Sequence, residues 1–114
     1  LIRSFEPLLQ ASPSGRAVFM SSGAATSRRA FWGVYAASKS ALEALVQCWA
    51  HETEQSNLRI NLVDPGPVRT QMRAKAMPGE DPSVLPQPAD IAVKIAPLLS
   101  PEWDTHGDVI SVRG

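Results

Sequence analysis

The sequence contains a single cysteine, Cys48, which excludes an internal disulfide bond and a cysteine-rich zinc site. An excess of charge of one sign is also absent, because 11 basic residues balance 11 acidic residues. Nucleic-acid binding needs clustered Lys and Arg, so we expect no nucleic-acid partner. No apolar run reaches the ~20 residues that cross a bilayer. Residues 1–10 include Arg3 and Glu6 and do not resemble a signal peptide, so we expect a cytoplasmic location and no membrane partner.

Metal-binding and nucleophilic patterns are missing as well. The two histidines, His51 and His106, have no cysteine or carboxylate at metal-ligand spacing, so no metal site is predicted. Cys48 has no evident cationic neighbour, and we expect a small buried side chain rather than a nucleophile. With 114 residues, 44% hydrophobic and 19% charged, the composition is that of one globular domain with a modest core.

Short apolar runs alternate with helical patterns along the chain. Continuous apolar runs are typical of strands that are covered on both faces, as in parallel sheets. The continuous apolar run at residues 17–20 predicts one such strand, and two further short strands are predicted at residues 59–63 and 108–112. Apolar residues at helical spacing and stretches without Gly and Pro predict helices at residues 1–10, 36–54 and 72–77, and from residue 88. This alternation of strands and helices indicates an α/β fold with right-handed crossovers.

The first residue is Leu1, which opens directly into the helical pattern of residues 1–10 without a capping residue before it. We therefore expect a truncated or processed chain. The alternative is an ordinary N-terminal helix in a sequence that is numbered from its first residue.

Tyr35 and Lys39 are four residues apart at the start of the long predicted helix, so they share one helix face. A tyrosine exchanges protons near neutral pH only when its pKa falls from about 10. A neighbouring ammonium group and the positive end of a helix dipole both favour the phenolate. The pair is a candidate site of proton transfer, although the same spacing also occurs on ordinary solvated helix faces.

Two further polar segments follow predicted strands. Ligands of open parallel sheets bind beyond the carboxyl ends of the strands, where Ser22 follows the first strand and could hold a carbonyl against Tyr35. The alternative for Ser22 is a turn cap. Residues 65–70 follow the second strand with the sequence Pro-Gly-Pro-Val-Arg-Thr. In this segment Gly66 permits close approach to a flat ligand, and Thr70 offers a hydroxyl to an amide or phosphate.

In this order, Ser22, the Tyr-Ala-Ala-Ser-Lys of residues 35–39 and the Pro-Gly loop of residues 65–70 resemble the short-chain dehydrogenase/reductase family. The resemblance covers essentially the whole chain. Trp32-Gly33 and residues 69–74 are similar to a poorly characterised bacterial subgroup. The fold that this resemblance implies is the C-terminal half of a Rossmann-like, doubly wound parallel sheet, with three strands and flanking helices.

The resemblance also implies an oxidoreductase that interconverts carbonyls and alcohols of small molecules with NAD or NADP. Tyr35 would give a proton to the substrate oxygen or accept one from it. Lys39 would lower the pKa of Tyr35 and bind the ribose of the nicotinamide cofactor. Ser22 would orient the substrate oxygen.

The same resemblance suggests which residues contact the ligands. Besides Tyr35 and Lys39, the loop after the second strand would hold the nicotinamide, through Pro65, Gly66, Val68 and Thr70. The predicted substrate pocket includes Gly23, Trp32 and Met72. Residues 71–88 are rich in Ala, Met and Pro, and we expect them to cover an apolar substrate.

The sequence departs from the family in its glycines. No two of the 7 glycines are two residues apart, so no G-x-G turn for a pyrophosphate is present. We therefore assign residues 1–114 to a partial domain, the catalytic half of the family's fold, and expect this chain alone to be inactive and without micromolar affinity for the cofactor. The alternative is a non-catalytic fragment that acts only in self-association. An open strand edge and uncovered helix faces predict a homodimer or a larger assembly.

Overall fold

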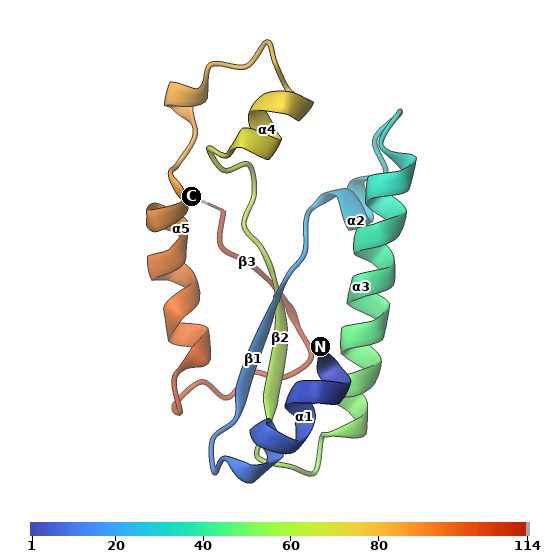
Figure 1. Ribbon diagram of the computed structural model, residues 1–114, viewed down its shortest axis with the longest axis vertical. Coiled ribbons are helices and arrows are strands. Elements are labelled where there is room, and N and C mark those ends of the chain that lie inside the picture. The colour runs from blue at the N-terminus through green and yellow to red at the C-terminus, as the bar shows by residue number, and fades with distance from the viewer. Residues whose placement is uncertain (114) are drawn as a thin grey trace.

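The computed structural model describes residues 1–113 as an open sheet flanked by helices (Figure 1). Gly114, the last residue of the predicted domain, lies outside the described residues. The strands β1 (Arg16–Met20), β2 (Arg59–Asp64) and β3 (Val109–Ser111) are parallel and lie in the order β1-β2-β3. The predicted α/β fold is therefore confirmed, and each predicted strand agrees with the structure to within one residue at either end.

Three helices of eight or more residues flank the sheet: α1 (Ile2–Ala11), α3 (Gly33–Glu52) and α5 (Pro88–Ile95). Figure 1 shows α3 and α5 on opposite sides of the sheet. The predicted bounds 36–54 of the long helix are wrong, because its first turn closes earlier. The Ala36 N–H donates to the Trp32 carbonyl at 2.8 Å, which places Tyr35 inside the first turn.

The described residues 1–113 also contain four shorter helical segments. The predicted helix at residues 72–77 is α4 (Gln71–Ala76). The sequence analysis missed α2 (Ala24–Ser27) and two 3₁₀ turns, η1 (Pro82–Val84) and η2 (Ala96–Leu99). Segments of three or four residues are too short to show helical periodicity, so nothing in the pattern predicted them.

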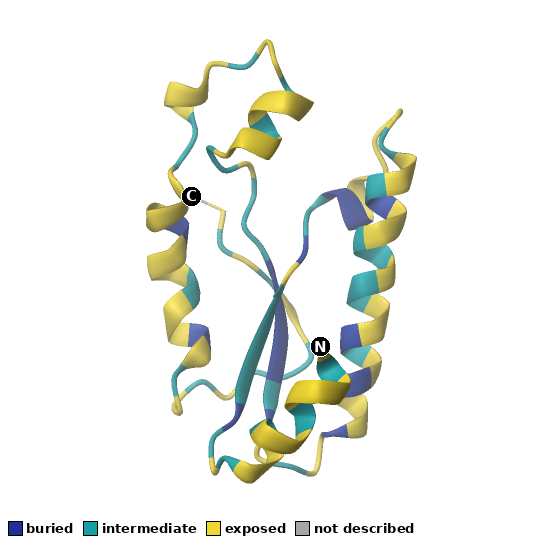
Figure 2. Cartoon of the chain, in the orientation of Figure 1, coloured by how far each residue is buried: buried dark blue, intermediate teal, exposed yellow. Residues whose placement is uncertain are grey.

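The core lies between α3 and the sheet, where Val46, Trp49, Ile60 and Leu62 are at most 3% exposed (Figure 2). The expectation that Cys48 is buried is wrong, because this thiol is exposed. Helical periodicity turns positions 46, 49 and 50 toward the sheet and position 48 away from it.

No helix within residues 1–113 is long and apolar enough to cross a membrane. In the same part of the chain, no three His, Cys, Asp or Glu side chains come together in a way that would hold a metal ion.

Candidate active site

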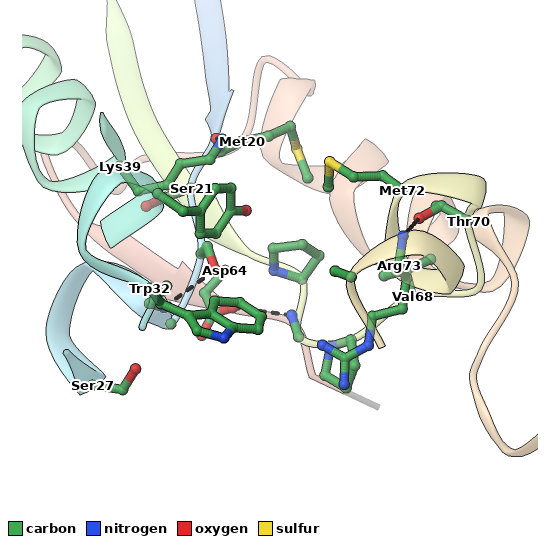
Figure 3. A pocket seen from close by; sticks show the side chains of 18 of the residues that line it. Met20, Ser21, Ser27, Trp32, Lys39, Asp64, Val68, Thr70, Met72 and Arg73 are labelled. Carbon is green, nitrogen blue, oxygen red and sulfur yellow. Dashed lines mark hydrogen bonds between the residues drawn. The ribbon is translucent and has the colours of Figure 1, made fainter. Parts of the chain in front are cut away.

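The carboxyl ends of β1 and β2 open into a cavity of about 1310 Å³. Three separate segments contribute to its wall: the turn after β1, the start of α3 and the loop after β2 (Figure 3). All ten residues that the sequence predicts for the site line this cavity: Ser22, Gly23, Trp32, Tyr35, Lys39, Pro65, Gly66, Val68, Thr70 and Met72. The structure thus brings the predicted residues together at the edge where ligands of parallel sheets bind.

Tyr35 lies in the first turn of α3, between Trp32 and Lys39. Its ring meets the Trp32 ring edge-to-face, with 5.9 Å between the centroids. The Lys39 ammonium lies 5.8 Å from the centroid of the Tyr35 ring and donates a hydrogen bond of 3.0 Å to the Met20 carbonyl. The end of β1 therefore holds Lys39 beside Tyr35, where its positive charge is attracted by the ring face.

The Ser22 hydroxyl accepts a hydrogen bond of 3.2 Å from the Ala24 N–H, at the turn that leads into α2. This is the turn-cap contact that the sequence analysis weighed as an alternative. A hydroxyl that accepts one hydrogen bond still has its own proton to donate. The turn thus orients Ser22 at the cavity wall and leaves its donor free for a ligand oxygen.

The loop after β2 offers its backbone to the cavity. Gly66 has φ +70°, a conformation in which other residues are strained, and a Cβ there would stand 2.8 Å from Cγ of Arg113. Among residues 1–113, neither the N–H nor the carbonyl of Val68 forms a hydrogen bond, although Val68 lines the cavity. A carboxamide needs one acceptor and one donor, so this free pair fits the amide group of a nicotinamide.

The charged residues Asp64 and Arg113 of the cavity wall are among those that the sequence analysis missed. Asp64 at the end of β2 accepts from the Gly66 N–H through Oδ1 at 3.0 Å and from Nε of Arg113 through Oδ2 at 3.0 Å. Arg113 lies across Gly23 and Gly66, and a Cβ at either position would require the Arg113 side chain to shift. No spacing in the sequence could reveal this contact, because the parallel pairing of β2 and β3 creates it.

The sequence analysis also missed the unusual backbone of residues 28–32, the segment before α3. Arg28 and Phe31 adopt positive φ values of 51° and 70°, which is uncommon for residues other than glycine. Phe31 is fully exposed and lines the cavity, and the Arg29 guanidinium lies 5.3 Å from the centroid of the Trp32 ring. Backbone strain of this kind gathers at functional sites. The sequence gives no sign of it, because no Gly or Asn marks either position.

Comparison with known proteins identifies relatives along the whole chain. A family model for short chain dehydrogenases matches residues 1–81. The uncharacterized oxidoreductase YciK of Escherichia coli is 50% identical over 91 residues, which are 80% of this chain and 36% of YciK. Two solved structures of putative short chain dehydrogenases superimpose with TM-scores of 0.91 and 42% identity, one from Shigella flexneri with NADP and one from Escherichia coli with NADPH.

Each of these two superpositions covers 97% of this chain and 46% of the solved chain. The chain thus spans less than half the length of these relatives. The identity to YciK also confirms the predicted similarity to a poorly characterised bacterial subgroup. By its sequence match and its fold, the chain belongs to the short-chain dehydrogenase family of oxidoreductases.

Proposed function

We propose that this cavity interconverts a carbonyl and an alcohol on a small molecule, with NAD or NADP as the second substrate. The observation that carries the proposal is the gathering of Ser22, Tyr35 and Lys39 with the free Val68 backbone in one cavity. The NADP and NADPH in the two solved relatives support the choice of cofactor.

In the direction of reduction, the Tyr35 phenol gives its proton to the substrate oxygen. Ser22 donates a second hydrogen bond to the same oxygen and so holds it beside Tyr35, which aligns the two reacting groups. Lys39 lies over the Tyr35 ring, and its charge stabilises the phenolate that proton transfer leaves behind. The alcohol forms when the substrate carbon has gained a hydride and its oxygen has gained this proton.

The nicotinamide supplies that hydride when it is bound. Val68 would meet its carboxamide with a backbone N–H and carbonyl, Thr70 would add a hydroxyl, and Gly66 leaves room for close approach. The sequence contains no G-x-G turn for the pyrophosphate. We therefore assign the activity to a polypeptide that also supplies a glycine-rich βαβ unit, and expect these 114 residues alone to bind neither NADH nor NADPH in the micromolar range.

Two measurements test the proposal. Calorimetric titration of the 114-residue chain with each cofactor should give no saturable heat, and clear saturation would reveal a phosphate site elsewhere in the chain. In the natural protein that carries this sequence, turnover is followed by the absorbance of the reduced cofactor over a panel of aldehydes and ketones. The proposal is wrong if Ser22→Ala and Tyr35→Phe both keep the parent turnover.

A second candidate function, self-association without catalysis, is favoured by the uncovered surface of the first elements. In residues 1–113, β1 pairs only with β2, so its other edge is open. Phe5 and Leu8 of α1 and Met20 of β1 are 43–68% exposed. Light scattering coupled to size exclusion should show a dimer or larger species of the 12.3 kDa chain, and a folded monomer would contradict this candidate.

A further inference from the structure

The loop between β2 and α5, residues 69–86, is closed on itself. The Arg69 N–H donates to the Pro86 carbonyl at 2.9 Å, which joins the two ends of the loop. Among the described residues 1–113, every hydrogen bond that residues 69–86 form has its partner in the same loop. Figure 1 shows the loop, with α4, beyond the carboxyl edge of the sheet. Surface loops that a rigid scaffold holds in place often carry binding and catalytic residues.

The ion pair between Arg73 and Glu80 ties α4 to the returning half of this loop. Nε of Arg73 lies 2.8 Å from Oε1 of Glu80, and Nη2 lies 2.9 Å from Oε2, so the pair is bidentate. Both side chains are about three-quarters buried, at 22% and 26% exposed. The hydrogen bond from Arg73 lowers the pKa of Glu80, so the carboxylate form that accepts this hydrogen bond is favoured over the protonated acid. Bidentate, charge-assisted pairs are the strongest hydrogen bonds of side chains.

The guanidinium of Arg69 supports the same returning half. It donates to the carbonyls of Pro82 at 2.8 Å, Ser83 at 3.2 Å and Leu85 at 3.3 Å. These contacts hold the segment around η1 but do not reach α4. The Arg73–Glu80 pair is thus the side-chain link between α4 and residues 80–85 within the described chain.

The loop also forms part of the cavity wall, through Thr70, Met72, Arg73 and Ala76. Thr70 caps α4 by accepting from the Arg73 N–H at 3.1 Å, and Figure 3 shows Met72 pointing toward Met20 across the cavity. The helix α4 has six residues and none is buried, so neither its length nor its packing holds it in place. The position of its side chains therefore depends on the link to Glu80.

We propose that Arg73 and Glu80 are positioning residues, whose ion pair holds the 69–86 loop as one rigid unit and so fixes Thr70 and Met72 at the cavity wall. The inference deepens the proposed function, and its kinetic consequence rests on that function. Loss of the pair weakens substrate binding equally in the ground state and the transition state, so it raises KM more than it lowers kcat.

The first test measures amide hydrogen exchange in the natural protein that carries this sequence. The Met77 N–H donates to Arg73 and the Leu85 N–H donates to Pro82, so these two amides report on the loop. In Glu80→Gln both should exchange about fivefold faster, and the double variant Arg73→Glu/Glu80→Arg should restore slow exchange. The matched control Asp104→Asn removes the Arg59–Asp104 ion pair, which joins β2 to the segment before β3, and should leave both amides unchanged.

The second test is kinetic. With a carbonyl substrate, Glu80→Gln should raise KM about tenfold while kcat changes less than about twofold, and the charge swap should lower KM again. Arg73→Lys keeps the charge but loses the bidentate geometry, so its KM should lie between those of the parent and Glu80→Gln. Unchanged amide exchange in Glu80→Gln, or faster exchange with an unchanged KM, would overturn the proposal.

Different results would contradict the proposed function and the positioning role of the Arg73–Glu80 pair. A parent protein that reduces no carbonyl compound contradicts the proposed function. The positioning role is then decided by the methyl resonance of isotope-labelled Met72. This resonance should shift in Glu80→Gln and return in the charge swap, and a resonance that does not move would overturn the role of the pair.

Discussion

The two ends of the sheet differ in how their apolar side chains are covered. At the amino-terminal end of β2, Trp49, Leu58 and Ile60 are at most 3% exposed. Beyond the carboxyl edge, Phe31 and Met72 are 105% and 67% exposed and line the cavity. Each exposed apolar Å² costs about 25 cal/mol relative to burial, so an uncovered apolar wall is typical of a surface that binds something. The buried residues at one end of the sheet stabilise the fold, and the uncovered wall at the other end is where we propose that ligands bind.

Strained backbone is also found at one end of the sheet, the end that carries the cavity. In the part of the chain that the structure describes, the two non-glycine residues with positive φ are Arg28 and Phe31, both in the segment before α3, and Phe31 lines the cavity. At the amino-terminal end of the sheet, β1 and β2 form a regular parallel pairing that begins at Arg16 and Arg59. The well-buried residues and the strained backbone therefore lie at opposite ends of the sheet.

The sharpest test of this division is Tyr35→Phe in the natural protein. Loss of the proton donor should lower turnover by about a thousandfold, because general acid catalysis contributes roughly that factor. The free energy of unfolding should change by less than about 0.5 kcal/mol, since the ring and its contact with Trp32 are kept. Turnover and chemical denaturation measure the two quantities, and near-normal turnover would remove Tyr35 from the proposed mechanism.

The opposite result is expected at the covered end of the sheet. Ile60 is fully buried, so Ile60→Ala should lower the free energy of unfolding by about 2–5 kcal/mol through lost burial and a cavity. Its control at the other end, Met72→Ala, removes a similar volume from an exposed site and should cost less than about 0.5 kcal/mol. Denaturant titration compares the pair, and equal losses would show that the cavity wall also carries stability.

The two histidines provide a smaller test of the covered end. Nδ1 of His106 accepts from the buried Ile60 N–H at 3.0 Å, and Nε2 lies 2.7 Å from the Ala50 carbonyl. His106→Ala leaves the Ile60 N–H without this partner and should cost about 1–3 kcal/mol of unfolding free energy. The matched variant His51→Ala changes an exposed side chain at the end of α3 and should be close to neutral. A similar loss in both variants would contradict the structural role of His106.

The smallest expected effect is the response of the 69–86 loop to acid. Hydrogen bonds from Arg73 lower the pKa of Glu80 below its ordinary 4.5, and those from Ser83 lower the pKa of Asp81 below its ordinary 3.8. A carboxylate with a lowered pKa stabilises the folded loop fully at pH values above its ordinary pKa. This stabilisation is lost as the pH falls through the lowered pKa. The protection of the Leu85 amide, corrected for intrinsic exchange, should therefore stay constant from pH ~7 to ~5 and fall below pH ~4. Loss of protection already between pH ~7 and ~5 would contradict the ion pair.

Much of the fold was predictable because local pattern and tertiary environment agree. Residues 60–63 of β2 are buried, as expected of a strand that is covered on both faces, whereas the apolar run at residues 17–20 forms the partly buried strand β1. The prediction for Cys48 failed because apolar character alone does not say which helix face a side chain occupies. The start of α3 was missed by three residues because no capping side chain marks it.

The residues of the candidate site also fall into those that the sequence could predict and those that it could not. Ser22, Tyr35 and Gly66 could be named from residue type, spacing and order, since each follows or begins an element whose pattern is plain. Asp64, Arg113 and Phe31 could not, because their place in the cavity depends on strand pairing and on a strained turn. The catalytic roles of Ser22 and Tyr35 remain predictions, which the variants at these two positions test.

By itself, the sequence determined the order of strands and helices, the edge of the sheet that faces ligands and the residue types that gather there. These follow from periodicities of two and 3.6 residues and from turn residues, which act over short stretches of chain. Only the tertiary structure decided that Arg113 lies across Gly23 and Gly66, and that Arg73 holds Glu80 within a self-contained loop. Such contacts join side chains whose separation in the chain carries no pattern, so packing in three dimensions alone brings them together.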